Sequence, residues 1–109
     1  MSAPITITFQ FSDGVSHDAS VTEASISQAI CYKYGWSIAP TVAGLDATPT
    51  YTIEVSNNNI DFFLYDTPVV DALIGQAFDD THLDWLYIRI NYDAQLNTTG
   101  TVEFPLILK

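Results

Sequence analysis

The residues of this chain that could do chemistry are few and scattered. Its two histidines, His17 and His82, each lie beside an acidic residue. A zinc site or a hydrolase needs groups that converge from several elements of the fold. Two isolated histidines have no such spacing, so we expect both to lie in solvated loops without a metal-binding or catalytic role.

Two further candidates have the composition of a site without its spacing. Asp79, Asp80 and Asp84 could supply the several oxygen ligands that Ca²⁺ prefers, but the segment lacks EF-hand spacing. Cys31, the only cysteine, lies in a strand-like run without the basic surroundings of a nucleophilic thiolate. We expect it to be a small core or interface residue. The sequence therefore predicts no catalytic residues, no metal, no cofactor and a protein that is not an enzyme.

Aromatic side chains are the other conspicuous group, and they have two interpretations. They stack on sugar rings in carbohydrate-binding sandwiches, and they also fill cores and subunit interfaces. Alternation along residues 84–92 directs Trp85, Tyr87 and Arg89 outwards. We predict that these three residues, together with Trp36, form an interface. A register different by one residue would place them in the core instead.

The elements that must position these residues read as strands separated by turns. Alternation of apolar and polar residues predicts strands over residues 5–11, 32–38, 50–56, 61–65, 84–92 and 101–108. Asn57, Asn58 and Asn59 predict a hairpin turn that tolerates left-handed backbone. Residues 25–31 fit a helical period as well as a strand. Pro105 indicates an edge strand or a bulge, because proline has no N–H.

This order of elements predicts an all-β fold, a jelly-roll-like, two-sheet antiparallel sandwich of about seven to eight strands. A chain of 109 residues forms one domain, 1–109. Its first part, residues 1–24, could be an N-terminal arm or an added strand.

The charge balance excludes some classes of partner. The chain has 13 acidic and three basic residues, for a net charge of -10. Nucleic-acid binding needs several Lys or Arg on phosphates, and anionic membranes are disfavoured for the same reason. A single cysteine gives no intrachain disulfide, and the first residues lack the features of a secretion signal. We therefore expect folding in a reducing cytoplasm.

Several short motifs follow one another in order over residues 25–109. They are the strand Tyr34–Ile38, the hairpin strand Tyr51–Asn57, the strand Leu86–Tyr92, and Thr99–Val102 leading to a terminal strand that ends at Lys109. This order resembles a group of small tailed-bacteriophage virion proteins, and the hairpin is similar to one in discoidin-like sandwiches. The chain departs from the family pattern at Asn58, where an Asp is usual, and at Phe62 or Phe63, where a Trp is usual.

The resemblance implies a component of the virus particle, such as a capsid decoration, neck or tail-associated protein. Its implied partners are the major capsid protein or other virion proteins, and further copies of itself as a homo-oligomer. It implies a place in the virion after synthesis in the host cytoplasm. The alternative is a carbohydrate-binding module of a receptor-binding apparatus, with Trp85, Tyr87 or Trp36 as the stacking platform.

Overall fold

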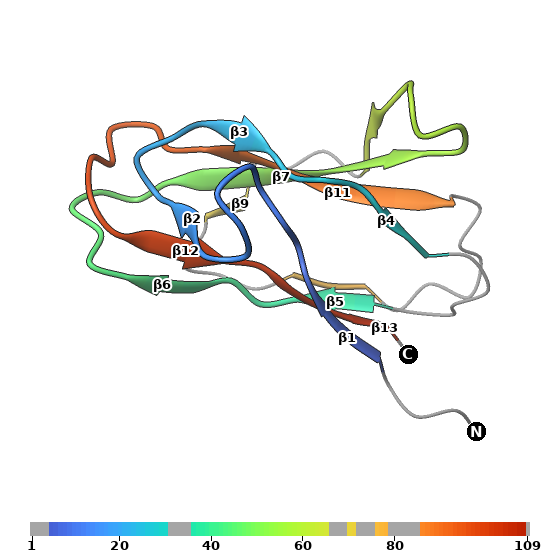
Figure 1. Ribbon diagram of the computed structural model, residues 1–109, viewed down its shortest axis with the longest axis horizontal. Helices are drawn as coiled ribbons and strands as arrows, with labels where there is room; N and C mark the ends of the chain where they lie inside the picture. The colour runs from blue at the N-terminus through green and yellow to red at the C-terminus, as the bar shows by residue number, and fades with distance from the viewer. Residues whose placement is uncertain (1–4, 31–35, 66–69, 72–75, 79–85, 109) are drawn as a thin grey trace.

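The computed structural model describes residues 5–30, 36–65, 70–71, 76–78 and 86–108, and within them the chain is all β with no helix (Figure 1). The described residues accordingly contain no helix of the length and apolarity that crosses a membrane. In chain order the strands are β1 (Ile5–Thr8), β2 (His17–Asp18), β3 (Glu23–Ala24), β4 (Gln28–Ala29), β5 (Trp36–Ile38), β6 (Thr41–Ala43), β7 (Thr50–Ser56), β8 (Phe63–Leu64), β9 (Val70–Asp71), β10 (Gln76–Phe78), β11 (Tyr87–Asp93), β12 (Thr101–Glu103) and β13 (Pro105–Leu108).

One layer of the sandwich is a six-stranded sheet built on the long antiparallel pair β7 and β11. Its order is β3-β11-β7-β8, with β4 also paired to β11 and β9 to β7. The central register runs from Tyr87 opposite Ser56 to Asp93 opposite Thr50. Every second side chain of these strands is buried, as the alternation predicted. The buried set is Tyr51, Ile53, Val55, Ile88, Ile90 and Tyr92.

The other layer consists of two smaller sheets that share one run of chain, β12 followed by β13. Their orders are β1-β13-β5-β10 and β2-β12-β6. The register is continuous across the break, because Glu103 pairs with Thr41 and Leu106 with Ile38. Pro105 starts β13 and Pro40 lies between β5 and β6, and proline cannot donate to a ladder. The predicted sandwich is therefore confirmed, with three sheets where two were expected.

The position of Pro105 corrects one expectation. It starts β13, which lies between β1 and β5 and is not an edge strand. A first strand position suits proline. The alternation over residues 101–108 directs Val102, Phe104, Leu106 and Leu108 to one inward face, and all four are buried.

The core between the layers is rich in aromatic rings. Phe104 contacts Tyr51 and Tyr92 with ring centroids 5.0 and 5.9 Å apart. Burial raises the pKa of Tyr92 to about 12, with smaller contributions from nearby acidic groups. The Tyr92 hydroxyl donates to the carbonyl of Ala19 at 2.7 Å, which satisfies the one polar atom of the ring. The core thus ties the N-terminal loops to the central sheet.

Two turns cross closely at one end of the sandwich. Gly100 has a φ of 94°, and a Cβ there would lie 2.3 Å from the carbonyl oxygen of Ala43. Gly44, on the facing turn, accepts a hydrogen bond from Thr99 Oγ1 at 2.7 Å. Only glycine satisfies both the backbone angle and the spacing at Gly100.

The first 30 residues differ in detail from expectation. The predicted strand over residues 5–11 is strand only to Thr8, although Phe9 and Phe11 are buried as predicted. β1 is the edge strand next to β13. The helical alternative for residues 25–31 is not observed within the described part, where β4 forms instead. Residues 31–35 and most of 66–85 lie outside the described residues.

Candidate functional site

Two regions with functional side chains lie at opposite ends of the β7–β11 pair. One is the loop between β7 and β8, residues 57–62, at the Ser56 end of the register. The other contains Asp13, His17 and Glu23 and lies at the Tyr92 end, where Glu23 pairs with Tyr92. We call the first region the hairpin tip and the three residues of the second the polar cluster.

The hairpin tip is held by hydrogen bonds within its own residues. The hydroxyl of Ser56 accepts the N–H groups of Asn58 and Asn59 at 3.2 and 2.9 Å. The side-chain oxygen of Asn58 accepts the N–H groups of Ile60 and Asp61 at 2.9 and 2.8 Å. Asn59 has a φ of 62°, so the predicted left-handed turn is confirmed. The loop backbone is therefore fixed by its own polar side chains.

Apolar side chains at this end of the molecule face solvent. Ile60 is 80% exposed, Phe63 56% and Leu64 52%. Leu86, 43% exposed, borders the tip because its N–H donates to the backbone carbonyl of Ser56 at 3.1 Å. These four residues, here called the apolar tip, lie on the turn, on β8 and beside β11. Phe63, opposite Val55, and Leu64, opposite Glu54, project to opposite faces of the sheet. Large exposed apolar side chains at one end of a molecule are candidates for an interaction site.

The predicted interface residues are only partly brought together. Tyr87 and Arg89 lie half-buried on the outer face of β11, as the alternation predicted. The guanidinium of Arg89 donates from Nε to Glu54 at 2.7 Å and lies 3.9 Å from the ring centre of Phe62. Arg89 is therefore already engaged within the chain, by an ion pair and a cation–π contact.

Of the two tryptophans of the predicted interface, the structure describes only Trp36. Trp36 is fully buried in the core, where its indole packs 5.3 Å from the ring of Tyr65 and offers no surface to a partner. Trp85 lies outside the described residues. Of the three aromatic residues considered for stacking on a sugar, the described part of the chain therefore places only Tyr87 at the surface.

The sequence interpretation did not include the apolar tip. The signal was present, because three apolar residues in a row, Phe62 to Leu64, cannot all face inwards from a strand. Ile60 follows three asparagines, a position typical of an exposed turn. An apolar side chain on such a turn is the feature that could have revealed the surface.

At the opposite end, His17 is buried, which corrects its expected place in a solvated loop. Its side chain is 1% exposed. β2 pairs with β12, so that His17 lies opposite Val102 and points inwards with it. Phe11 stacks on the imidazole at a centroid distance of 4.2 Å, and the ring of Tyr92 meets it edge-on at 5.4 Å.

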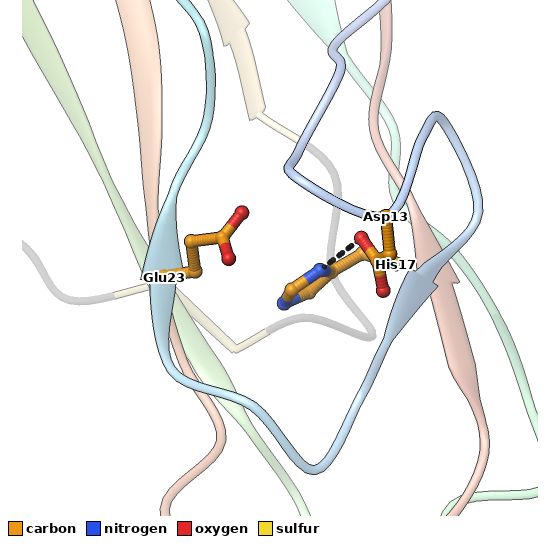
Figure 2. Close-up of side chains that lie close together, drawn as sticks. All are labelled: Asp13, His17 and Glu23. Atoms are coloured by element: carbon orange, nitrogen blue, oxygen red, sulfur yellow. Dashed lines mark hydrogen bonds and ion pairs between the residues drawn. The ribbon is translucent and has the colours of Figure 1, made fainter.

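Both ring nitrogens of His17 have hydrogen-bond partners. Nδ1 lies 2.8 Å from Asp13 Oδ1 (Figure 2). Nε2 lies 2.7 Å from the backbone carbonyl of Val21. A carbonyl only accepts, so Nε2 carries a proton. With both nitrogens engaged, neither is placed to take a proton from a nucleophile, and the cluster is not a nucleophile–base pair.

The two carboxylates of the polar cluster also accept hydrogen bonds from neighbouring residues. Asp13 Oδ2 accepts the N–H of Asp18 at 2.7 Å. Glu23 accepts the N–H and the hydroxyl of Ser12 at 2.7 and 2.6 Å. Burial works to raise the pKa of Asp13, but the hydrogen bonds from Asp18 and His17 and the charge of His17 lower it overall. The bonds from the Ser12 hydroxyl and N–H lower the pKa of Glu23. Both groups are thus stabilised as carboxylates.

The remaining candidate residues from the sequence are not placed. His82, Cys31, Asp79, Asp80 and Asp84 all lie outside the described residues. Their expected roles stay predictions.

Comparison with known proteins gives a likeness of fold. No protein-family model matches the chain, and no curated protein matches it. The crystal structure of YomS, a protein derived from the SPBc2 prophage, is similar with a TM-score of 0.58 and 7% sequence identity. The match covers 100% of this chain and 97% of that chain. At this identity the likeness shows a shared fold along the whole chain.

Proposed function

We propose that this chain is a non-enzymatic structural protein of a bacteriophage particle, acting by protein–protein assembly as a capsid decoration, neck or tail-associated component. The observation that carries the proposal is the apolar tip, four large apolar side chains exposed at the hairpin end of the β7–β11 pair, one on and three beside a turn that is fixed by its own hydrogen bonds. The likeness of fold to a prophage-derived protein supports a phage-related role. The ordered motifs of residues 25–109 support it as well.

The apolar tip has the properties that association requires. Full burial of an apolar side chain of this size contributes about 1.5–3 kcal/mol. Association costs several kcal/mol in lost freedom of the partners and in ordering of loops. The tip loop is already ordered by Ser56 and Asn58, so that less of this cost remains to be met. Four exposed apolar side chains can therefore provide net binding.

Charge contributes less to the proposed binding than apolar contact. Within the described residues the one lysine or arginine is Arg89, and it is engaged by Glu54. The partners we propose are the major capsid protein or another virion protein, with several copies of this chain on each particle. Each copy would insert Ile60 and its neighbours into an apolar depression of the partner.

The test is incorporation into particles. The variant Ile60→Ser with Leu64→Ser changes the tip without changing charge, and Leu96→Ser is the matched control because Leu96 is 85% exposed at the other end of β11. Phage would be purified from cells expressing each variant, and the copy number per particle measured by quantitative mass spectrometry. We expect the tip variant to lose about 10-fold or more in copy number, in keeping with the loss of two interface anchors, and the control to match wild type.

Two outcomes would contradict the proposal in different ways. Equal incorporation of the tip variant and wild type would show that another surface binds. Absence of the wild-type chain from purified particles would overturn the structural role itself.

A further inference from the structure

The polar cluster gathers metal-ligand chemistry from three separate segments. Asp13 lies in the turn between Phe11 and Gly14, His17 on β2 and Glu23 on β3. Figure 2 shows the two carboxylates on either side of the imidazole. One ligand atom from each residue lies within 4.8 Å of the other two. If each of the three ligand atoms moved by about an ångström or less, all of them could form the roughly 2 Å bonds that a transition metal makes.

The orientation of His17 is that of a metal ligand. Its Nε2–H donates to the carbonyl of Val21, which lies outside the cluster, and Nδ1 faces Asp13 Oδ1 at 2.8 Å. Metal-binding histidines almost always donate their second N–H to a carbonyl or carboxylate in this way, because the bond fixes both the tautomer and the direction of the ring. The ring is held further by Phe11 on its face and Tyr92 at its edge.

The charges of the cluster favour a divalent cation. The two carboxylates of the cluster contribute two negative charges beside the imidazole. A divalent cation bound by these two carboxylates and by a neutral imidazole nitrogen leaves the site with no net charge. The net charge of -10 on the chain also raises the local concentration of cations.

Residues around the polar cluster orient its carboxylates and leave the cluster open to solvent on one side. Asp18 and Ser12 donate to the carboxylate oxygens, as outer-shell groups do around bound metals. The side chain of Asp13 is 37% exposed, which leaves a path for the ion and a coordination position for water. One nitrogen and two oxygen ligands suit zinc and its neighbours, whereas Ca²⁺ takes oxygen ligands.

We propose that Asp13, His17 and Glu23 bind one divalent transition-metal ion of the zinc class. Because β2 belongs to one layer of the sandwich and β3 to the other, the ion crosslinks the two layers at this end of the molecule. The site is structural, and it stands independently of the function proposed above.

The experiment uses the whole chain, stripped with a chelator and titrated with Zn²⁺ by calorimetry and with Co²⁺ by visible absorption. We expect one ion per chain and Co²⁺ bands of a site that contains nitrogen. Asp13→Asn and Glu23→Gln keep the shape of the ligands and should each weaken binding about 10-fold or more, since each removes a charged ligand. Asp46→Asn is the matched control, because Asp46 is an exposed carboxylate that also accepts bonds from the N–H and hydroxyl of Thr98.

Each result decides the matter. Loss of binding in the two cluster variants, with Asp46→Asn unchanged, supports the site. Failure of the wild-type chain to bind either ion overturns it. So does binding that persists in Glu23→Gln and disappears in His82→Gln, because the ion would then lie elsewhere on the chain. Thermal unfolding without metal checks that each variant is folded.

Discussion

The two ends of the β7–β11 pair differ in which side chains they bury and which they expose. At one end the polar cluster lies against the core, and each of its charged groups has a hydrogen-bond partner. At the other end the apolar tip is in solvent, and the polar groups beside it hold the loop backbone in shape. One end places a buried imidazole beside two partly exposed carboxylates, and the other leaves the side chains of Ile60 and Phe63 in solvent.

The difference separates residues needed for the fold from residues available for binding. A buried polar group that loses its partner costs its full desolvation penalty, so the polar cluster is coupled to folding. An exposed apolar side chain loses almost nothing when it is replaced, so the apolar tip is free of that coupling. Substitutions at the two ends should therefore have very different effects on the free energy of unfolding.

The largest effect is expected for His17→Ala. The change removes a buried ring beneath Phe11 and leaves Asp13 Oδ1 and the carbonyl of Val21 without their donor. We expect the free energy of unfolding to fall by about 3 kcal/mol, measured by urea denaturation at pH 7 without added metal. Leu96→Ala is the control. A loss below about 1 kcal/mol would mean that the polar cluster contributes no more to stability than the surface does.

A smaller effect, which depends on pH, is expected for Asp13→Asn. The folded state lowers the pKa of Asp13 from its ordinary value of 3.8, so the carboxylate stabilises the fold above that value and loses this effect as the pH falls through the folded pKa. At pH 7 the variant should be less stable by up to about 1 kcal/mol, because the group is partly exposed. The difference should disappear as the pH is lowered towards 2.

The measurement is the urea midpoint at a series of pH values between 7 and 2. Asp61→Asn, at the hairpin tip, removes the same charge from the other end of the molecule. If wild type and Asp13→Asn kept a constant difference over the whole series, the carboxylate would not be the group that matters.

The smallest effect is expected for Ile60→Ser alone. Its side chain is 80% exposed, so the free energy of unfolding should change by no more than about 0.5 kcal/mol. The same urea titration measures it. A loss above about 1 kcal/mol would show that Ile60 packs against the fold and would remove the contrast between the two ends.

The sequence predicted the fold best where one face of a strand is buried along its whole length. The β7 and β11 segments alternate cleanly, and their inward faces were assigned correctly from Tyr51 to Val55 and from Ile88 to Tyr92. The same alternation directs Leu86 inwards, which is wrong, because Leu86 is 43% exposed. The division of the second layer into two sheets could not be predicted. It depends on which distant strands pair with β12 and β13, on either side of the break before Pro105. Pairing between distant segments is not contained in a local pattern.

The candidate sites were harder to predict, for two physical reasons. β2 is two residues long, too short to show the alternation that would have marked His17 as inward. The burial of His17 depends on the pairing of β2 with β12, where His17 lies opposite Val102, far along the chain. Trp36 was predicted at an interface, yet it shares the inward phase of Ile38, and both are buried. The phase of a strand residue is better evidence of its surroundings than its type.

The crossing of turns at Gly100 has a consequence for the history of the chain. A side chain there would collide with the backbone at Ala43 and Gly44, which would separate the turns before β12 and after β6. Descendants of a common ancestor can exchange nearly every surface residue while such a crossing keeps its glycine. At 7% identity to a protein of the same fold, overall similarity is a poor guide to descent. Superposing this chain on other structures of the same fold would show whether each has a glycine at this crossing, as the backbone requires here.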